Sequence, residues 1–145
     1  MERVLEIIAT LTSGIFAGAA VYINFVEHPA RMQCGTMLAA TEFGPSYRRA
    51  ARMQAPLAAI AFVTAASGWL LGAGAWWLVG GICIGLAIPY TLIAIMPINN
   101  QLLRSDLDRE SGPTSHLLAK WNQLHAVRSL LGFIAFLIFV VLLAR

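Results

Sequence analysis

Charge is the scarcest property of this chain. Its 145 residues include only 10 lysines and arginines and 7 aspartates and glutamates. Charged residues make up 12% of the chain, whereas soluble domains carry about a quarter. The net charge is only +3, no nucleic-acid-binding motif accompanies it, and the mean hydropathy is +0.72. We therefore expect neither a soluble domain nor a nucleic-acid partner.

Cysteine and metal-binding motifs are also scarce. The chain has 2 cysteines, one in an expected loop (Cys34) and one in the middle of an expected membrane span (Cys83). This placement does not predict a disulfide. The 3 histidines carry no HExxH-type spacing, so the sequence holds no strong signal for a metal.

Long apolar runs, in contrast, are abundant. A helix needs roughly 20 apolar residues to cross a hydrocarbon core of about 30 Å, and 17 to 25 are tolerated. Four runs meet this requirement, at about 4–24, 55–72, 75–98 and 126–144. The sequence predicts an all-α fold, a bundle of four transmembrane helices that forms one integral membrane domain over residues 1–145. Its first partner is the lipid bilayer.

The connections between these runs predict the orientation in the membrane. Two long connections lie on one side, including a mixed loop at 33–54 that is broken at Gly44-Pro45, and a short turn at 72–75 lies on the other. Most basic residues belong to the long connections or their rims: Arg31, Arg48, Arg49, Arg52, Arg104, Arg109, Lys120 and Arg128. The positive-inside rule then places both long loops in the cytoplasm and both termini outside. The first run lacks a basic leader, so we interpret it as a span of the cytoplasmic membrane and not as a cleaved signal peptide.

Small residues recur one helical turn apart in three of the runs. The pairs are Gly14 and Gly18, Gly68 and Gly72, and Gly81 and Gly85. Such pairs let transmembrane helices approach closely. They indicate packing within the bundle, with a homo-oligomer contact as the alternative.

Two polar stripes stand at the ends of apolar runs. Residues three and four apart share one face of a helix. The first stripe closes the first run at i, i+3, i+4 and i+7, and the second opens the last run at i, i+4 and i+7. Their members are Asn24, Glu27, His28 and Arg31 in the first, and Trp121, His125 and Arg128 in the second. Ionisable groups at the hydrocarbon edge are costly, which favours a functional role for both stripes.

With four antiparallel spans, the loop-side ends of all the helices meet on one face. Arg52, Asn99 and Asn100 then join the two stripes around a pocket with an apolar floor. A hydrophobic small molecule is the expected ligand of such a pocket. The alternative is structural, since Asn99 and Asn100 can cap the third helix and arginines at helix ends can bind lipid headgroups.

Three chemistries fit these residue types. A carboxylate beside an imidazole can remove a proton from an acidic carbon or a phenol, with arginine and asparagine stabilising the anion. Alternatively, His28, His125 and Glu27 can ligate a transition metal. The two histidines can also ligate a haem between helices. Spacing does not decide among these chemistries, because the histidines lie on different helices.

Three motifs together resemble the anthrone-oxygenase-like family of small membrane proteins. They are Asn24-Phe25-Val26-Glu27-His28-Pro29-Ala30-Arg31, Met96-Pro97-Ile98-Asn99-Asn100 and Trp121-Asn122-Gln123-Leu124-His125-Ala126-Val127-Arg128. The resemblance covers nearly the whole chain. It implies oxidation of an anthrone to an anthraquinone with molecular oxygen during polyketide tailoring, with no added cofactor.

On this resemblance, the site residues have expected roles. His28 or His125 is the base, Glu27 orients it, and Arg128 and Asn99 hold the developing oxyanion, while Trp121 stacks on a flat aromatic substrate. Asn24, Asn100 and Arg52 are expected to contact the substrate.

Two other classes of function remain open. One is a metal- or haem-dependent redox protein that uses the same histidines. The other is a non-enzymatic membrane protein, either a small carrier or an accessory subunit. A coupled carrier usually keeps an ionisable residue in the middle of a span, and this sequence has none there.

Overall fold

The computed structural model describes residues 1–145 and contains helices but no strands. Two of the segments, η1 and η2, are π-helical, with a wider turn than an α-helix. In chain order the elements are α1 (Glu2–Tyr22), η1 (Ile23–Glu27), α2 (His28–Gln33), α3 (Thr36–Leu70), α4 (Ala75–Gly85), α5 (Ala87–Tyr90), η2 (Thr91–Ile95), α6 (Met96–Leu102) and α7 (Gly112–Leu143). The predicted all-α fold class is confirmed.

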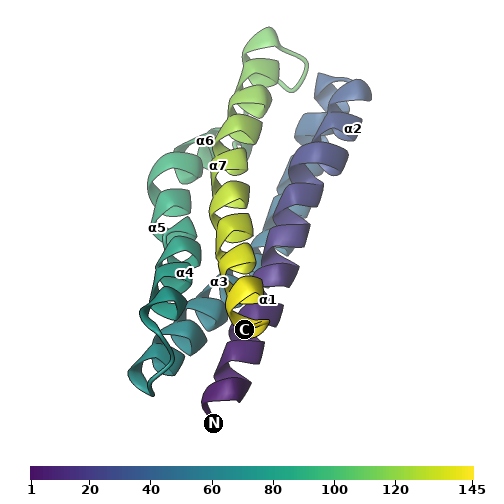
Figure 1. Ribbon diagram of the computed structural model, residues 1–145. Helices are drawn as coiled ribbons and strands as arrows, with labels where there is room; N and C mark the ends of the chain where they lie inside the picture. Colours follow the sequence, from purple (N-terminus) through teal and green to yellow (C-terminus); the bar gives the residue numbers. More distant parts are fainter.

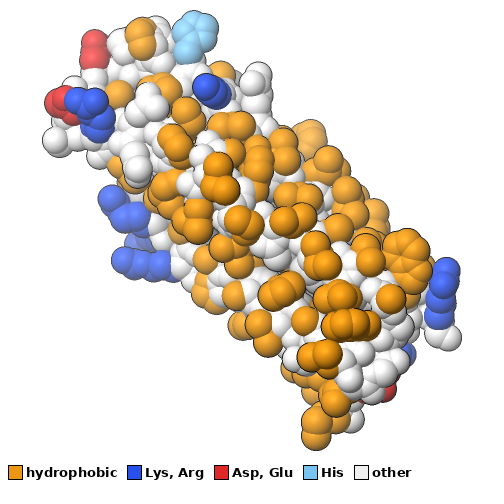
Figure 2. All heavy atoms as spheres, turned by 90° about the vertical axis from the view of Figure 1, so that its left-hand side faces the viewer, with side chains coloured by type: hydrophobic (Ala, Val, Ile, Leu, Met, Phe, Trp, Pro, Cys, Tyr) orange, Lys and Arg blue, Asp and Glu red, His pale blue; other side chains and the backbone are white.

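These elements form four rods that are long and apolar enough to cross a membrane: Glu2–Gln33, Thr36–Leu70, Ala75–Leu102 and Gly112–Leu143. The rods α1 and α4 each pack against both α3 and α7, so the bundle forms a ring in the order α1, α3, α4, α7. Both termini lie at one end of the bundle, and α2 and α6 lie at the other (Figure 1). Hydrophobic side chains cover most of the length of the face in Figure 2, as lipid contact requires.

The first connection differs from its prediction. Residues 36–54, expected in a mixed loop, continue the second rod as helix, and α3 includes both Pro45 and Pro56. Only Cys34 and Gly35 separate the first two rods, and Gly35 has a positive φ of 94° that suits a glycine. The helix persists because one of its faces is buried, including Ala39 and Phe43, and this packing outweighs the local cost of the proline. The one long connection is at 103–111.

A π-helical segment precedes a proline in two of the rods. Pro29 follows η1, and Pro97 follows η2. In an α-helix the proline ring clashes with the carbonyl four residues earlier. Those carbonyls belong to Phe25 and Ile93, which lie inside η1 and η2, where the wider turn relieves the clash. The first rod therefore continues through Pro29 to Gln33.

Aromatic rings pack against glycines in the core. A Cβ atom added to Gly132 on α7 would lie 2.5 Å from the ring of Phe16 on α1. A Cβ on Gly14 would lie 2.8 Å from the ring of Phe136, whereas nothing lies within 4 Å of the Cβ position of Gly18. These close approaches join helices of the same chain, which supports the interpretation of the small residues as packing within the bundle.

Candidate functional site

A cavity of about 180 Å³ lies at the end of the bundle that is remote from the termini. Its walls are mostly apolar and come from all four rods. Two of its lining residues, Ile88 and Leu92, are 37% and 58% exposed on the outer surface, so the rim of the cavity reaches the lipid-facing side of the bundle. A cleft with apolar walls and a few polar groups is the usual form of a small-molecule site, although this one is smaller than most.

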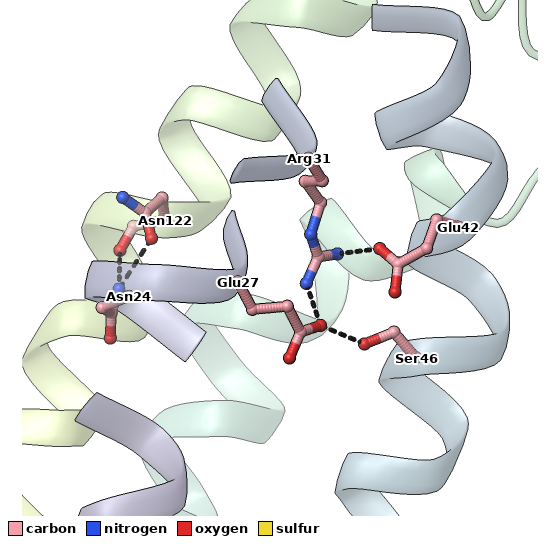
Figure 3. Close-up of polar contacts among 6 residues, drawn as sticks. All are labelled: Asn24, Glu27, Arg31, Glu42, Ser46 and Asn122. Atoms are coloured by element: carbon pink, nitrogen blue, oxygen red, sulfur yellow. Dashed lines mark hydrogen bonds and ion pairs between the residues drawn. The ribbon is translucent and has the colours of Figure 1, made fainter. Parts of the chain in front are cut away.

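The buried imidazole of His125 forms part of the cavity wall, and an asparagine from the first rod holds it. Nδ1 of His125 lies 2.9 Å from Oδ1 of Asn24. The same oxygen accepts a 2.5 Å hydrogen bond from Oγ of Ser129. On its other side, Nδ2 of Asn24 donates to the backbone carbonyl of Asn122 at 2.9 Å and to its Oδ1 at 2.7 Å (Figure 3).

These contacts determine which ring nitrogen of His125 carries the proton. The carbonyl of Asn122 can only accept, so the amide nitrogen of Asn24 must face it and Oδ1 must face His125. An amide oxygen also only accepts, so Nδ1 of His125 is the donor. In the neutral imidazole, Nε2 then presents a lone pair.

The guanidinium of Arg128 lies next to that lone pair. Its Nη1 is 3.2 Å from Nε2 of His125. Its Cζ also lies 4.8 Å from the ring centroid of Phe16, a cation–π contact that holds the guanidinium against α1. Arg128 and Phe16 both line the cavity. The cavity therefore presents an imidazole and a guanidinium side by side.

Trp121 forms an aromatic wall beside these two groups. Its ring stacks on that of His125 with centroids 4.7 Å apart, and it forms a T-shaped contact with the ring of Phe43, with centroids 5.3 Å apart. Its Nε1 donates to Oδ1 of Asn99 at 2.8 Å. The Nδ2 group of Asn99 is buried and has no partner. Asn99 and Trp121 both line the cavity.

The carboxylate of Glu27 binds Arg31 and Ser46 and makes no hydrogen bond with His28. Its Oε1 is ion-paired with Arg31 and accepts a 2.5 Å hydrogen bond from Ser46 (Figure 3). Arg31 also pairs with Glu42 of α3 at 3.1 Å. Adjacent helical residues point in different directions, so Glu27 turns toward α3 and does not orient His28. The expectation of a Glu27–His28 pair is wrong.

His28 is buried against Trp121, with ring centroids 5.5 Å apart. Its Nδ1 has no hydrogen-bond partner, and His28 is not among the residues that line the cavity. It supports the aromatic wall from behind.

The residues proposed as metal ligands do not form a cluster. No group of three or more His, Cys, Asp and Glu side chains lies close enough to hold an ion. Glu27 turns to Arg31, and both nitrogens of His125 already face partners, Asn24 and Arg128. The donor set therefore does not fit the three-ligand site considered from the sequence.

Two expected ligand-binding residues lie outside the cavity. Arg52 and Asn100 are both exposed, and neither lines the cavity. Asn100 follows Asn99 on the same helix, so only one of the pair can point inward.

Several residues of the site were missed in the sequence analysis. They are Ser129 and Asn122, which hold Asn24, together with Glu42 and Ser46, which hold Glu27 and Arg31. Ser129 could have been found, because it stands four residues after His125 on the same helical face. Glu42 and Ser46 carried no such signal, since their segment was expected to be a loop.

The sequence is similar to that of a known protein family. A family model described as anthrone oxygenase matches residues 43–138, which is more than half of the chain. The matched range includes Asn99, Trp121, His125 and Arg128, and it begins after the end of the first rod. Searches of curated proteins and of solved structures found no match.

Proposed function

This chain belongs to the anthrone oxygenase family, and on that premise we propose that it oxidises a flat aromatic or phenolic substrate with molecular oxygen in the cavity described above. One observation carries the proposal. A neutral imidazole with a lone pair on Nε2 stands beside the guanidinium of Arg128 at the wall of an apolar cavity. This pair supplies a base and a cation where a carbon acid needs them.

The first step is the removal of a proton. Nε2 of His125 takes a proton from the acidic carbon of the substrate, and the electron pair moves to the carbonyl oxygen. Arg128 turns its Nη1 from Nε2 to that oxyanion. The new imidazolium keeps its Nδ1–H bond to Asn24, so the ring stays in place. Trp121 stacks on the aromatic system of the substrate. The free amide NH₂ group of Asn99 donates a hydrogen bond to an oxygen atom attached to the rings.

The second step uses oxygen as the oxidant. The electron-rich carbon of the anion bonds to O₂, and the resulting peroxide takes the proton from the imidazolium. The same base then removes the second hydrogen of that carbon as a proton while the O–O bond breaks. The carbon becomes a carbonyl, and the departing hydroxide leaves as water. One anthrone and one O₂ give one anthraquinone and one water, so the reaction needs no external reductant, and the proposed route uses no added cofactor.

We also propose the orientation of the site. The basic residues gather at the end of the bundle that holds the cavity, and the positive-inside rule places that end in the cytoplasm and both termini outside.

Oxygen uptake with an anthrone tests the proposal. Protein in lipid nanodiscs is expected to accelerate uptake above that of empty nanodiscs, with one anthraquinone formed per O₂ consumed. His125→Ala is expected to lower turnover by about 10²- to 10⁴-fold, the usual contribution of a positioned base. His116→Ala is the matched control, because His116 is exposed on the same helix, and it should leave turnover unchanged. Full turnover in His125→Ala would rule out this residue as the base.

A further inference from the structure

Three arginines of the bundle are paired with carboxylates, whereas Arg128 has no carboxylate partner. Arg3, Arg31 and Arg104 each lie within 4.0 Å of an aspartate or glutamate oxygen. No carboxylate lies within that distance of Arg128. Its only polar contact is with Nε2 of His125.

The surroundings of Arg128 make an unpaired cation costly. It lies within the last rod, which is long and apolar enough to cross a membrane. Its guanidinium is packed against the ring of Phe16 and lines the apolar cavity. Charged groups in such surroundings usually pair with an opposite charge or mark a functional site.

The second arginine of the cavity already has its counter-charges. Arg31 is held between Glu27 and Glu42, and both carboxylates reach it from outside the cavity wall (Figure 3). This cluster carries a net charge of about −1 and does not call for a further anion. Arg128 is therefore the one cation in the cavity wall whose charge is not balanced.

From this imbalance we infer that the cavity is a binding site for planar aromatic molecules that carry a single negative charge. The apolar walls and the ring of Trp121 accept the aromatic part, and the guanidinium of Arg128 binds the charged oxygen. The inference rests on the proposed function, because the deprotonated substrate is such an anion. It goes further by predicting that stable, unreactive aromatic monoanions bind as mimics of that intermediate.

Calorimetric titration of the protein in nanodiscs tests this inference without any turnover. A two-ring probe suits a cavity of about 180 Å³. The probes are 2-naphthoate, which is ionised at neutral pH, and 2-naphthamide, its neutral isostere; empty nanodiscs correct for partition into lipid. Wild-type protein is expected to bind the carboxylate at least about tenfold more tightly than the amide. Equal affinities would overturn the inference, and this comparison needs no variant.

Variants then locate the charge. Arg128→Gln is expected to weaken naphthoate binding by about tenfold to a hundredfold and to change naphthamide binding less than about threefold. Arg128→Lys keeps the charge and should restore most of the affinity. Arg49→Gln is the matched control, because it removes an exposed cation outside the cavity, and it should bind as the wild type does. Unchanged naphthoate binding in Arg128→Gln would overturn the inference.

The outcome separates this inference from the proposed function. Binding of naphthoate that depends on Arg128, with no oxidation of anthrones, would leave the anion site standing and reject the oxygenase. Oxidation of anthrones by a protein that does not prefer naphthoate over naphthamide would support the oxygenase and reject the anion site.

Discussion

At the scale of single residues, Asn24 acts through His125. The sequence predicts that Asn24 contacts the substrate, but its amide is fully used within the protein. It donates to Asn122 of the last rod and accepts from the imidazole, so it links the two helices that carry the polar stripes. Its chemical effect is to fix the proton on Nδ1 and leave Nε2 as the base.

Nuclear magnetic resonance can observe this tautomer directly. Only 3 histidines are present, so selective ¹⁵N labelling gives three pairs of ring-nitrogen signals, and His125→Ala assigns one of these pairs. We expect Nδ1 of His125 to be protonated and Nε2 to show the shift of an unprotonated nitrogen. In Asn24→Ala the acceptor is lost, and the two shifts should move toward an average. Asn100→Ala, at an exposed position, should leave them unchanged. A protonated Nε2 in the wild type would contradict this assignment.

At the scale of helices, the contact between α1 and α7 supports the site from below. The ring of Phe16 fills the space above Gly132 and carries the guanidinium of Arg128 on its face. Phe16 is fully buried and also borders the cavity. The packing of two helices and the position of a functional cation therefore depend on the same side chain.

Gly132→Ala tests this dependence. The added Cβ would lie 2.5 Å from the ring of Phe16, and overpacking of this kind costs about 1–3 kcal/mol. Unfolding in mixed detergent micelles should show that loss, and naphthoate affinity should fall because the displaced ring moves Arg128. Gly18→Ala is the control, since nothing lies within 4 Å of its Cβ position. It should be neutral or stabilise by up to about 1 kcal/mol. A fully stable Gly132→Ala would show that Phe16 can move freely.

The helices also differ in how far their site residues could be predicted from the sequence. Trp121, His125 and Arg128 follow the helical period on an uninterrupted helix, so their shared face was predictable, and the structure brings all three to the cavity. The partners of Glu27 were not, because Gly44-Pro45 indicates a break in water-soluble chains. Tertiary packing of α3 carries the helix through that point and delivers Ser46 to Glu27.

The first rod shows a second limit. Counting three and four residues assumes an α-helix, but η1 inserts a wider turn between Asn24 and His28. Asn24 therefore reaches the last rod, while Glu27 turns toward α3. A π-helical turn leaves no periodic signal in a single sequence. A proline two residues after the turn does, however, provide a physical reason for such a turn to form.

At the scale of the whole molecule, the two ends of the bundle differ. One end holds both termini and the tight turn at Gly72, whose φ is 113°. The other holds the cavity, the 103–111 connection and the turn at Cys34 and Gly35. Polar and titratable side chains gather at that second end, so the membrane orientation decides which compartment faces the site.

Cys34 reports this orientation without any engineered residue. It is exposed at the cavity end, whereas the other cysteine, Cys83, is partly buried within a membrane-crossing rod. A membrane-impermeant maleimide should label the protein in inverted membrane vesicles and leave it unlabelled in intact cells. Cys34→Ser should abolish the labelling. Strong labelling in intact cells would reverse the proposed sidedness.

The exposed rim at Ile88 and Leu92 has a consequence for how the site is supplied. A cavity that reaches the lipid-facing surface equilibrates with the hydrocarbon phase, where both oxygen and flat aromatic molecules concentrate. Its occupancy then follows the mole fraction of ligand in the bilayer and not the molar concentration in the surrounding water. Diluting the membrane with additional lipid at constant total ligand would empty the cavity, so the bilayer acts as the reservoir that sets its working concentration.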